Sequence, residues 1–483
     1  MTSIASTIDW CTQPSRSGFL ALGPLLLFIT LATAVSPFSF PSLYDQARAF
    51  QLATLASTAL LFSFASLFLG AAGAESISVA PAAQRSVLLF ALLAVCSAAL
   101  AARPFWAFEE LALTFLLFIA VLTVVACFDR QSRAALDAAL MIAFMASAAL
   151  FVAVFTIAQL GAHDAGAKFQ WLAPFVSFAN VRFFSQYQAY TLPLMVLPLV
   201  AFRVPRRWRI GAFLIGAIWW ALQIAICTRA VWFGLLVELV FLVWFLRNEA
   251  KRFLGVQAAQ IAGGAMLYWV FTKLVQQAPP GVERIIAEGL DSADRLSLWR
   301  SALQMIADAP FLGVGPMHFA FQQMTIASHP HNTLLQVASE YGLIGLLLAL
   351  FALIFLLRWA VTTCRSAAGE NREINVALAA CLVMGLSDAM FSGNTLMPHS
   401  QMGLCVIVGW LLGRNRVMGA NRETGPTGNI LNGWKWVLPL LALLSLCVLG
   451  AGSVDYFAHR QDTPSAERVL HPRMWQNGHW PVT

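Results

Sequence analysis

Charged residues are scarce in this chain: Asp, Glu, Lys and Arg together make up 11% of its 483 residues, whereas hydrophobic residues make up 59%. In soluble domains, charged residues make up roughly a quarter of the sequence, so this composition excludes an ordinary soluble protein. Apolar runs of about 20 residues, long enough to span a bilayer, recur along the chain. We therefore predict an all-α, polytopic integral membrane protein with about 12–13 transmembrane helices.

The chain also lacks cysteine in the loops that we expect on the outer side of the membrane. Its eight cysteines lie in predicted helices, on cytoplasmic segments or near membrane edges, so no disulfide framework is expected. A contiguous basic patch is missing as well, although the net charge is +7. Because the basic residues do not gather in one patch, the sequence predicts no nucleic-acid partner.

The basic residues instead recur in alternate short connections. This is the positive-inside pattern, and it predicts a cytoplasmic N-terminus and a C-terminus outside the inner membrane. The residues concerned are Arg130, Arg133, Arg203, Arg206, Arg207, Arg209, Arg247, Lys251, Arg252, Arg358, Arg365, Arg372, Arg414, Arg416, Arg422 and Lys435.

This topology predicts five regions along the chain. They are scaffold helices (1–160), central helices with an outer loop at 161–189 (161–275), a large periplasmic loop with two short amphipathic helices (276–332), C-terminal transmembrane helices (333–454) and a periplasmic tail (455–483). The tail is too short for a separate domain, and it either docks on the outer loops or lies along the surface.

The sequence from Ser328 to Thr333 leads directly into an apolar run, and it contains His329 and His331. Asn332 is a favourable N-cap for a helix that starts here. Its unpaired N–H groups and positive dipole end would face His331, where anions are favoured. We expect the chemistry at this position.

Glu340 lies inside the same apolar run, roughly 12 Å further along the helix axis. An unpaired carboxylate is costly there, so Glu340 needs a partner or a proton. Asp388, near the outer end of a later helix, is a candidate partner for Glu340, for Arg229 or for an arginine of the outer loop. Gly342 and Gly345 are expected on one helix face, where a neighbouring helix can come close.

Arginines on other outer segments are candidates for holding an anion. Arg229 separates two apolar runs with no acid nearby, which favours a bound anion; contact with lipid phosphates is the lesser alternative. In the second amphipathic helix, Arg295 and Arg300 lie off an apolar stripe that we expect on the membrane surface, so both can point toward a site. Leu296, Trp299, Leu303 and Ile306 form that stripe.

The outer loop at 161–189 offers Asn180, Arg182 and Gln186 among aromatic residues. This mixture suits a surface for a sugar or a lipid headgroup, and an interfacial loop with aromatic anchors is an equal alternative. Zinc is a further alternative at the histidines, with His318 and His399 joining His329 and His331. The i,i+2 pair converges poorly on one ion, however, so we expect no metal site.

The pattern His331-Asn332, nine residues, then Gly342-Leu343-Ile344-Gly345 resembles the signature of the O-antigen ligase family. That superfamily also holds O-antigen polymerases and bacterial protein O-oligosaccharyltransferases. The resemblance covers mainly 290–350. It implies that His331 is the catalytic base or orienting group, that Arg229 and Arg295 hold the diphosphate of an undecaprenyl-linked glycan, and that no metal or other cofactor takes part.

The residues themselves suit the same chemistry. Arginines grip phosphate oxygens and a histidine can take a proton from a hydroxyl, so the sequence predicts transfer of a preassembled glycan from undecaprenyl diphosphate to a hydroxyl acceptor in the periplasm. Lipid A core is the preferred acceptor, with a pilin-like Ser or Thr and a second glycan chain as alternatives. A transporter or flippase for the lipid-linked sugar, with Glu340 and Asp388 as proton relay, is the alternative from another class.

Overall fold

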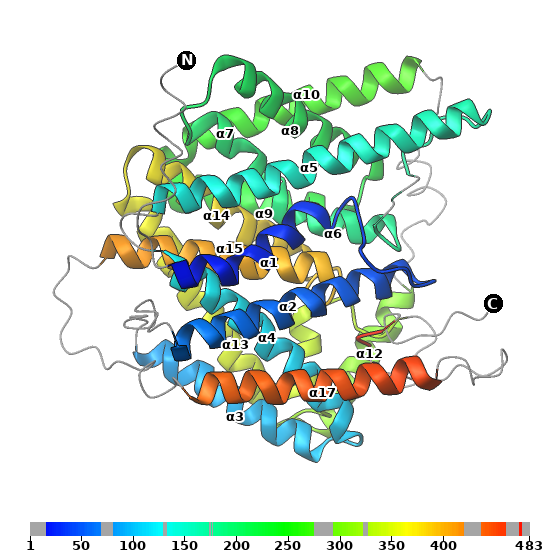
Figure 1. The fold of residues 1–483 in the computed structure, drawn as a ribbon, viewed down its shortest axis with the longest axis vertical. Helices are drawn as coiled ribbons and strands as arrows, with labels where there is room; N and C mark the ends of the chain where they lie inside the picture. The colour runs from blue at the N-terminus through cyan, green and yellow to red at the C-terminus, as the bar shows by residue number, and fades with distance from the viewer. Residues whose placement is uncertain are drawn as a thin grey trace.

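A computed structural model describes residues 16–68, 81–128, 133–172, 175, 177–274, 293–321, 327–419, 436–459 and 473–475. These residues form long helices that run side by side, and no strand occurs among them (Figure 1). Seven of the described helices are long and apolar enough to cross a membrane. The predicted all-α polytopic membrane protein is therefore confirmed.

The principal helices follow one another in chain order with few long connections. They are α1 (Arg16–Leu31), α2 (Leu43–Phe68), α3 (Pro81–Leu100), α4 (Pro104–Cys127), α5 (Arg133–Asp164), α6 (Val181–Thr191), α7 (Leu197–Val200), α8 (Arg206–Ile226), α9 (Arg229–Phe241), α10 (Lys251–Leu274), α12 (Ala293–Asp308), α13 (Thr333–Ser366), α14 (Gly369–Asp388), α15 (Pro398–Gly419) and α17 (Val437–His459). The first predicted amphipathic helix of the outer loop falls mainly on 275–292, outside the described residues.

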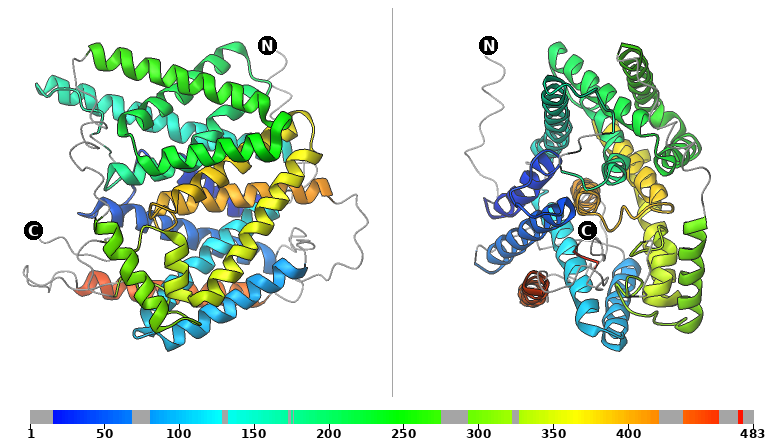
Figure 2. Two further views of the ribbon diagram at one scale, coloured as in Figure 1. Left: turned by 180° about the vertical axis from the view of Figure 1, so that it is seen from behind. Right: turned by 90° about the vertical axis from the view of Figure 1, so that its right-hand side faces the viewer.

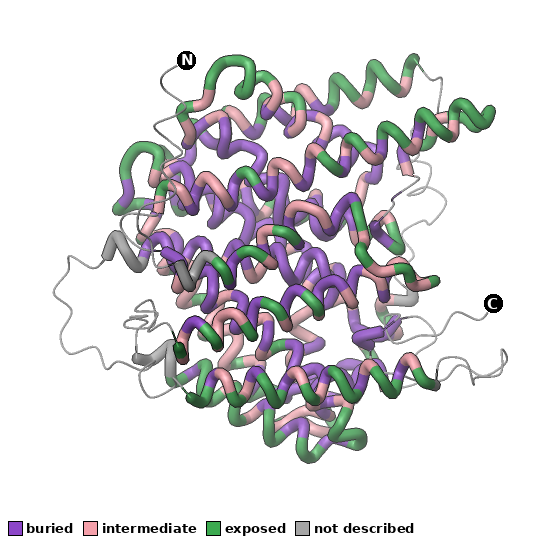
Figure 3. The backbone as a smooth tube through the Cα atoms, viewed as in Figure 1, coloured by how far each residue is buried: buried purple, intermediate pink, exposed green. Residues whose placement is uncertain are grey.

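Helix α14 forms the centre of the bundle. Its residues from Glu373 to Gly385 are all buried, because α6, α9, α13 and α15 surround it. A helix that is buried all round needs no polar face, which explains its weak amphipathicity. Outer helices bury only their inward side (Figure 3).

The bundle has two chemically different ends. At one end, Arg203 pairs with Glu370 at 3.3 Å and Arg365 donates to the carbonyl oxygen of Phe245. Helix α13 ends at this basic end beside Arg365 and begins beside His331. The predicted basic connections at these positions thus lie together, away from the histidine motif.

Helix α13 is broken at Gly342, which has φ +74° and lies outside the helical region. The loop before it enters the break: the amide N–H of Leu343 donates to the carbonyl oxygen of Pro310 at 2.8 Å. A Cβ on Gly342 would meet the carbonyl oxygen of Phe311 at 2.2 Å. The expectation that Gly342 faces a neighbouring helix is therefore wrong, whereas Gly345 does face α3.

Helix α12 packs across the first half of α13 (Figure 2). Its buried side consists of Leu298, Ala302 and Met305, which form a small core with Phe319. The predicted stripe is a different face, and its members Leu296 and Leu303 stay exposed. That exposed apolar face is compatible with contact to the membrane surface.

Candidate active site

The candidate site begins at the start of α13. Asn332 has an extended backbone, and its side-chain oxygen accepts a hydrogen bond from the amide of Leu335 at 3.0 Å. The predicted N-cap is confirmed. Thr333 fixes this start against the end of α14, because its amide donates to the carbonyl oxygen of Ala389 at 3.1 Å. The helix N-terminus that the sequence predicts is thus built and held in place.

His331 adopts an unusual backbone conformation at this helix start. Its φ of +52° lies in the left-handed region, which non-glycine residues rarely adopt. Its amide donates to Nδ1 of His329 at 3.2 Å, and the two rings meet edge to face with centroids 4.2 Å apart. Such strain persists only where the surroundings hold it, and it clusters at functional sites.

Two further elements hold the segment 328–332, called the histidine loop below. Trp299 of α12 donates from Nε1 to the carbonyl oxygen of Pro330 at 3.0 Å. On the other side, the buried ring of His329 lies against Gly393, where a Cβ would come within 2.3 Å of the ring. His329 therefore supports the position of His331.

Guanidinium groups from two other helices act on His331. Burial first, and then the positive charges of Arg295 and Arg182, lower the pKa of His331 to about 4. The imidazole is therefore neutral at pH 7 and can accept a proton. Arg295 comes from α12 and Arg182 from α6, so the structure brings together residues that are far apart in the sequence.

Asn180 and Gln186, the other predicted residues of this region, lie at the N-cap of α6 and within α6. Asn180 caps this helix, with its side-chain oxygen accepting from the amide of Arg182 at 2.8 Å. Gln186 follows Arg182 by four residues, which puts both on one face. It is buried, and its Oε1 has no hydrogen-bond partner among the described residues.

Arg229 and Arg300 occupy less central positions. Arg229 starts α9 and is exposed, at the same end of the bundle as His331, since Phe233 one turn later contacts Phe391 at 5.1 Å between centroids. It is not among the charges that lower the pKa of His331. Arg300 is exposed and follows Arg295 by five residues, which turns it away by roughly 140° around the helix axis.

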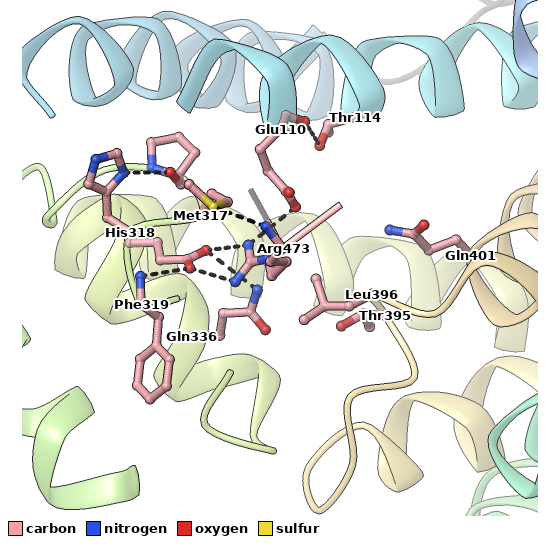
Figure 4. Close-up of polar contacts among 12 residues, drawn as sticks. Glu110, Thr114, Met317, His318, Phe319, Gln336, Thr395, Leu396, Gln401 and Arg473 are labelled. Atoms are coloured by element: carbon pink, nitrogen blue, oxygen red, sulfur yellow. Dashed lines mark hydrogen bonds and ion pairs between the residues drawn. The ribbon is translucent and has the colours of Figure 1, made fainter. Parts of the chain in front are cut away.

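The partner of Glu340 is Arg473, a residue of the C-terminal tail. The two side chains form a bidentate pair, with nitrogen–oxygen distances of 2.7 and 2.9 Å, and Arg473 also reaches Glu110 at 3.2 Å (Figure 4). Asp388, the predicted candidate, instead accepts hydrogen bonds from Ser392 and Asn394. The expectation that Asp388 partners Glu340 is therefore wrong, whereas the positive charge of Arg295, an arginine of the predicted outer loop, does act on Asp388.

The tail segment Arg473–Trp475 docks inside the bundle, at the end that contains the histidine motif. Met474 accepts from Nε of Arg48 at 3.1 Å through its carbonyl oxygen, and the ring of Trp475 stacks on Tyr456 with centroids 5.2 Å apart. Of the two expectations for the tail, docking is thus correct for this segment. No local sequence pattern predicted that Arg48, Arg473 and Glu110 take part in the polar contacts of this segment.

His318 and His399, the other two candidates for a zinc site, are engaged elsewhere. The Nε2 of His318 accepts from the amide of Arg103 at 2.9 Å. The ring of His399 stacks on Phe178 with centroids 4.3 Å apart, and its Nε2 contacts the carbonyl oxygen of Ala32. Neither ring joins His329 and His331.

A match to a known family covers part of this site. Residues 217–350 match the family model described as O-antigen ligase. This stretch of the chain resembles an O-antigen ligase domain. This domain extends from α8 into α13 and contains Arg229, Arg295, His331 and Glu340, so the resemblance indicated by the histidine motif is confirmed. The match supports a glycosyltransferase of the ligase and polymerase type; no curated protein matches the chain.

Proposed function

We propose that this protein transfers a preassembled glycan from an undecaprenyl-diphosphate carrier to a hydroxyl group, with the lipid A core as acceptor. One observation carries the proposal. Within the region that matches O-antigen ligases, His331 lies at a helix N-terminus and is neutral, because burial and the positive charges of Arg295 and Arg182 lower its pKa. A base beside a cationic site suits a hydroxyl acceptor and a diphosphate leaving group.

The reaction requires one bond to form and one to break. The acceptor oxygen attacks the anomeric carbon of the glycan, and the bond from that carbon to the diphosphate oxygen breaks. His331 takes the proton of the hydroxyl, while the departing diphosphate keeps the bonding electrons. Arg295 and Arg182 stabilise its growing negative charge, and Arg229 extends the cationic surface along the donor.

We place the site on the periplasmic side of the inner membrane. The support is the separation of charge: the basic connections gather at the opposite end of the bundle, which the positive-inside rule assigns to the cytoplasm. A polyprenyl carrier reaches such a site from the outer leaflet. Exposed apolar residues on α12 are compatible with that approach.

The test is transfer by the purified protein in detergent, with a lipid-linked donor and a panel of lipid A core, protein and glycan acceptors. His331→Asn is the informative variant, because Asn tolerates the left-handed backbone better than most residues. We expect at least a hundredfold loss of rate. His163→Ala, an exposed histidine at the same end, is the matched control and should retain full activity.

The outcome also separates the remaining alternatives. Transfer to a protein or to a second glycan alone would replace the proposed acceptor but keep the mechanism. A transporter needs a gradient and two compartments, so transfer in detergent contradicts it. The paired state of Glu340 with Arg473 makes this carboxylate a poor proton relay, which favours the enzyme.

A further inference from the structure

A hollow with a volume of about 590 Å³ lies at the basic end of the bundle, far along the helices from His331. Arg203, Arg209 and Arg252 line it, together with Glu370 and the apolar side chains of Leu199 and Phe202. These residues come from the α7–α8 connection, α8, α10 and α14. The α7–α8 connection, α8 and α10 thus each bring one guanidinium group to the same hollow, and α14 brings one carboxylate.

The positive charge in this hollow exceeds the negative charge by two. Glu370 pairs with Arg203 at 3.3 Å, but the two side chains are 54% and 95% exposed, so water and salt weaken that pair. Arg252 also acts on the buried Glu373 of α14, beside which Arg372 supplies a further positive charge. The excess of two charges remains when both are included.

Backbone groups add to this preference for an anion. Helix α8 spans 21 residues and starts directly after Pro205, which also lines the hollow. The N-cap residue, Pro205, makes no side-chain hydrogen bond to the first amide N–H groups. The positive end of the α8 dipole therefore acts in the same direction as the three arginines.

Exposed apolar side chains on α8, the helix that starts at the hollow, indicate what else the ligand carries. On α8, Trp208 is 63% exposed, and Ile210 and Leu214 also stay exposed. Tryptophan is enriched where membrane helices meet the lipid headgroups. A ligand with a phosphate in the hollow and an acyl chain along α8 would use both features.

We propose that this hollow binds the phosphate headgroup of an anionic phospholipid, in the leaflet opposite the His331 site. The site is separate from glycan transfer, since none of its residues contacts the histidine loop. Its role is to bind a lipid of this class at the junction of α7, α8, α10 and α14. The proposal stands or falls independently of the proposed reaction.

The test compares two triple variants with equal loss of charge. Arg203→Gln/Arg209→Gln/Arg252→Gln empties the hollow of cations, whereas Arg206→Gln/Arg207→Gln/Arg358→Gln removes exposed arginines that do not line it. Thermal unfolding in detergent is followed while phosphatidylglycerol, phosphatidylcholine or inorganic phosphate is added. Native mass spectrometry counts the lipids retained.

We expect phosphatidylglycerol to raise the melting temperature of the wild type and of the control variant, and phosphatidylcholine to have little effect. In the lining variant, the apparent affinity for phosphatidylglycerol should fall at least about tenfold. Equal losses of affinity in both variants would mean that the lipid responds to general surface charge. If inorganic phosphate raised the melting temperature as much as phosphatidylglycerol does, the hollow would bind a soluble anion. Either result, or an indifferent wild type, overturns the proposal.

Discussion

Arg473 and Glu340 form a buried bidentate ion pair although 133 residues separate them in the chain. The pair ties the C-terminal tail to the half of α13 that begins at the histidine loop. Glu340 also accepts from the amide of Phe319, so the same carboxylate holds the loop before the histidine motif. A single tail residue therefore fixes two segments of the candidate site.

Replacement of Arg473 by Gln should destabilise the protein strongly. Removing one partner of a buried pair leaves an uncompensated charge and costs about 3–5 kcal/mol. We expect a clear drop in the melting temperature in detergent. Glu340→Gln combined with Arg473→Gln should cost less than the sum of both single variants. Additive losses would contradict a direct coupling.

Arg295 and Arg300 provide a matched comparison on one helix. Arg295→Gln removes a charge that acts on His331 and should lower kcat/KM for glycan transfer by about 10²–10³. Arg300→Gln should change it less than about threefold, because this side chain points elsewhere. Kinetics with purified lipid-linked donor measure both. Equal effects would remove the special role of Arg295.

The protonation of His331 can be measured without any activity. Its low pKa means that the reactive neutral imidazole persists as the pH falls, and is half lost only at about pH 4. Diethyl pyrocarbonate modification, mapped by peptide mass spectrometry, should therefore stay constant at His331 from pH 8 to about 5. In Arg295→Gln the midpoint should move up toward 6.5, the ordinary value. An unchanged midpoint would contradict the proximity of the two groups.

Gly393 should tolerate no side chain. A Cβ there would meet the ring of His329 at 2.3 Å, so Gly393→Ala must displace the support of His331. We expect loss of transfer activity greater than any loss of folded protein, judged by size-exclusion chromatography. Gly255→Ala on α10, where nothing lies within 4 Å of a Cβ, is the control and should be neutral.

Chelation of divalent metals should leave the transfer rate unchanged. In the proposed reaction, guanidinium groups rather than a metal ion stabilise the departing diphosphate. The rate with EDTA is compared with the rate in added Mg²⁺ or Mn²⁺. A rate that falls with EDTA and returns with one metal would show that the arginines alone are insufficient.

Local signals in the sequence predicted the class and the position of the site. Apolar runs predicted the helices, and Asn332 before such a run predicted the start of α13, because capping depends on neighbouring residues only. The histidine motif indicated the family that the match to residues 217–350 confirms. The break at Gly342 was missed, since it exists only because the loop at Pro310 enters the helix.

The sequence by itself determined that Glu340 must have a partner, because burying a charge in an apolar helix is costly wherever the helix lies. Only the tertiary structure decided that this partner is Arg473, and that Arg182 and Arg295 rather than Arg300 act on His331. The cost of burial belongs to one residue and its neighbours in sequence. The identity of a partner depends on how distant helices pack, which no local pattern contains.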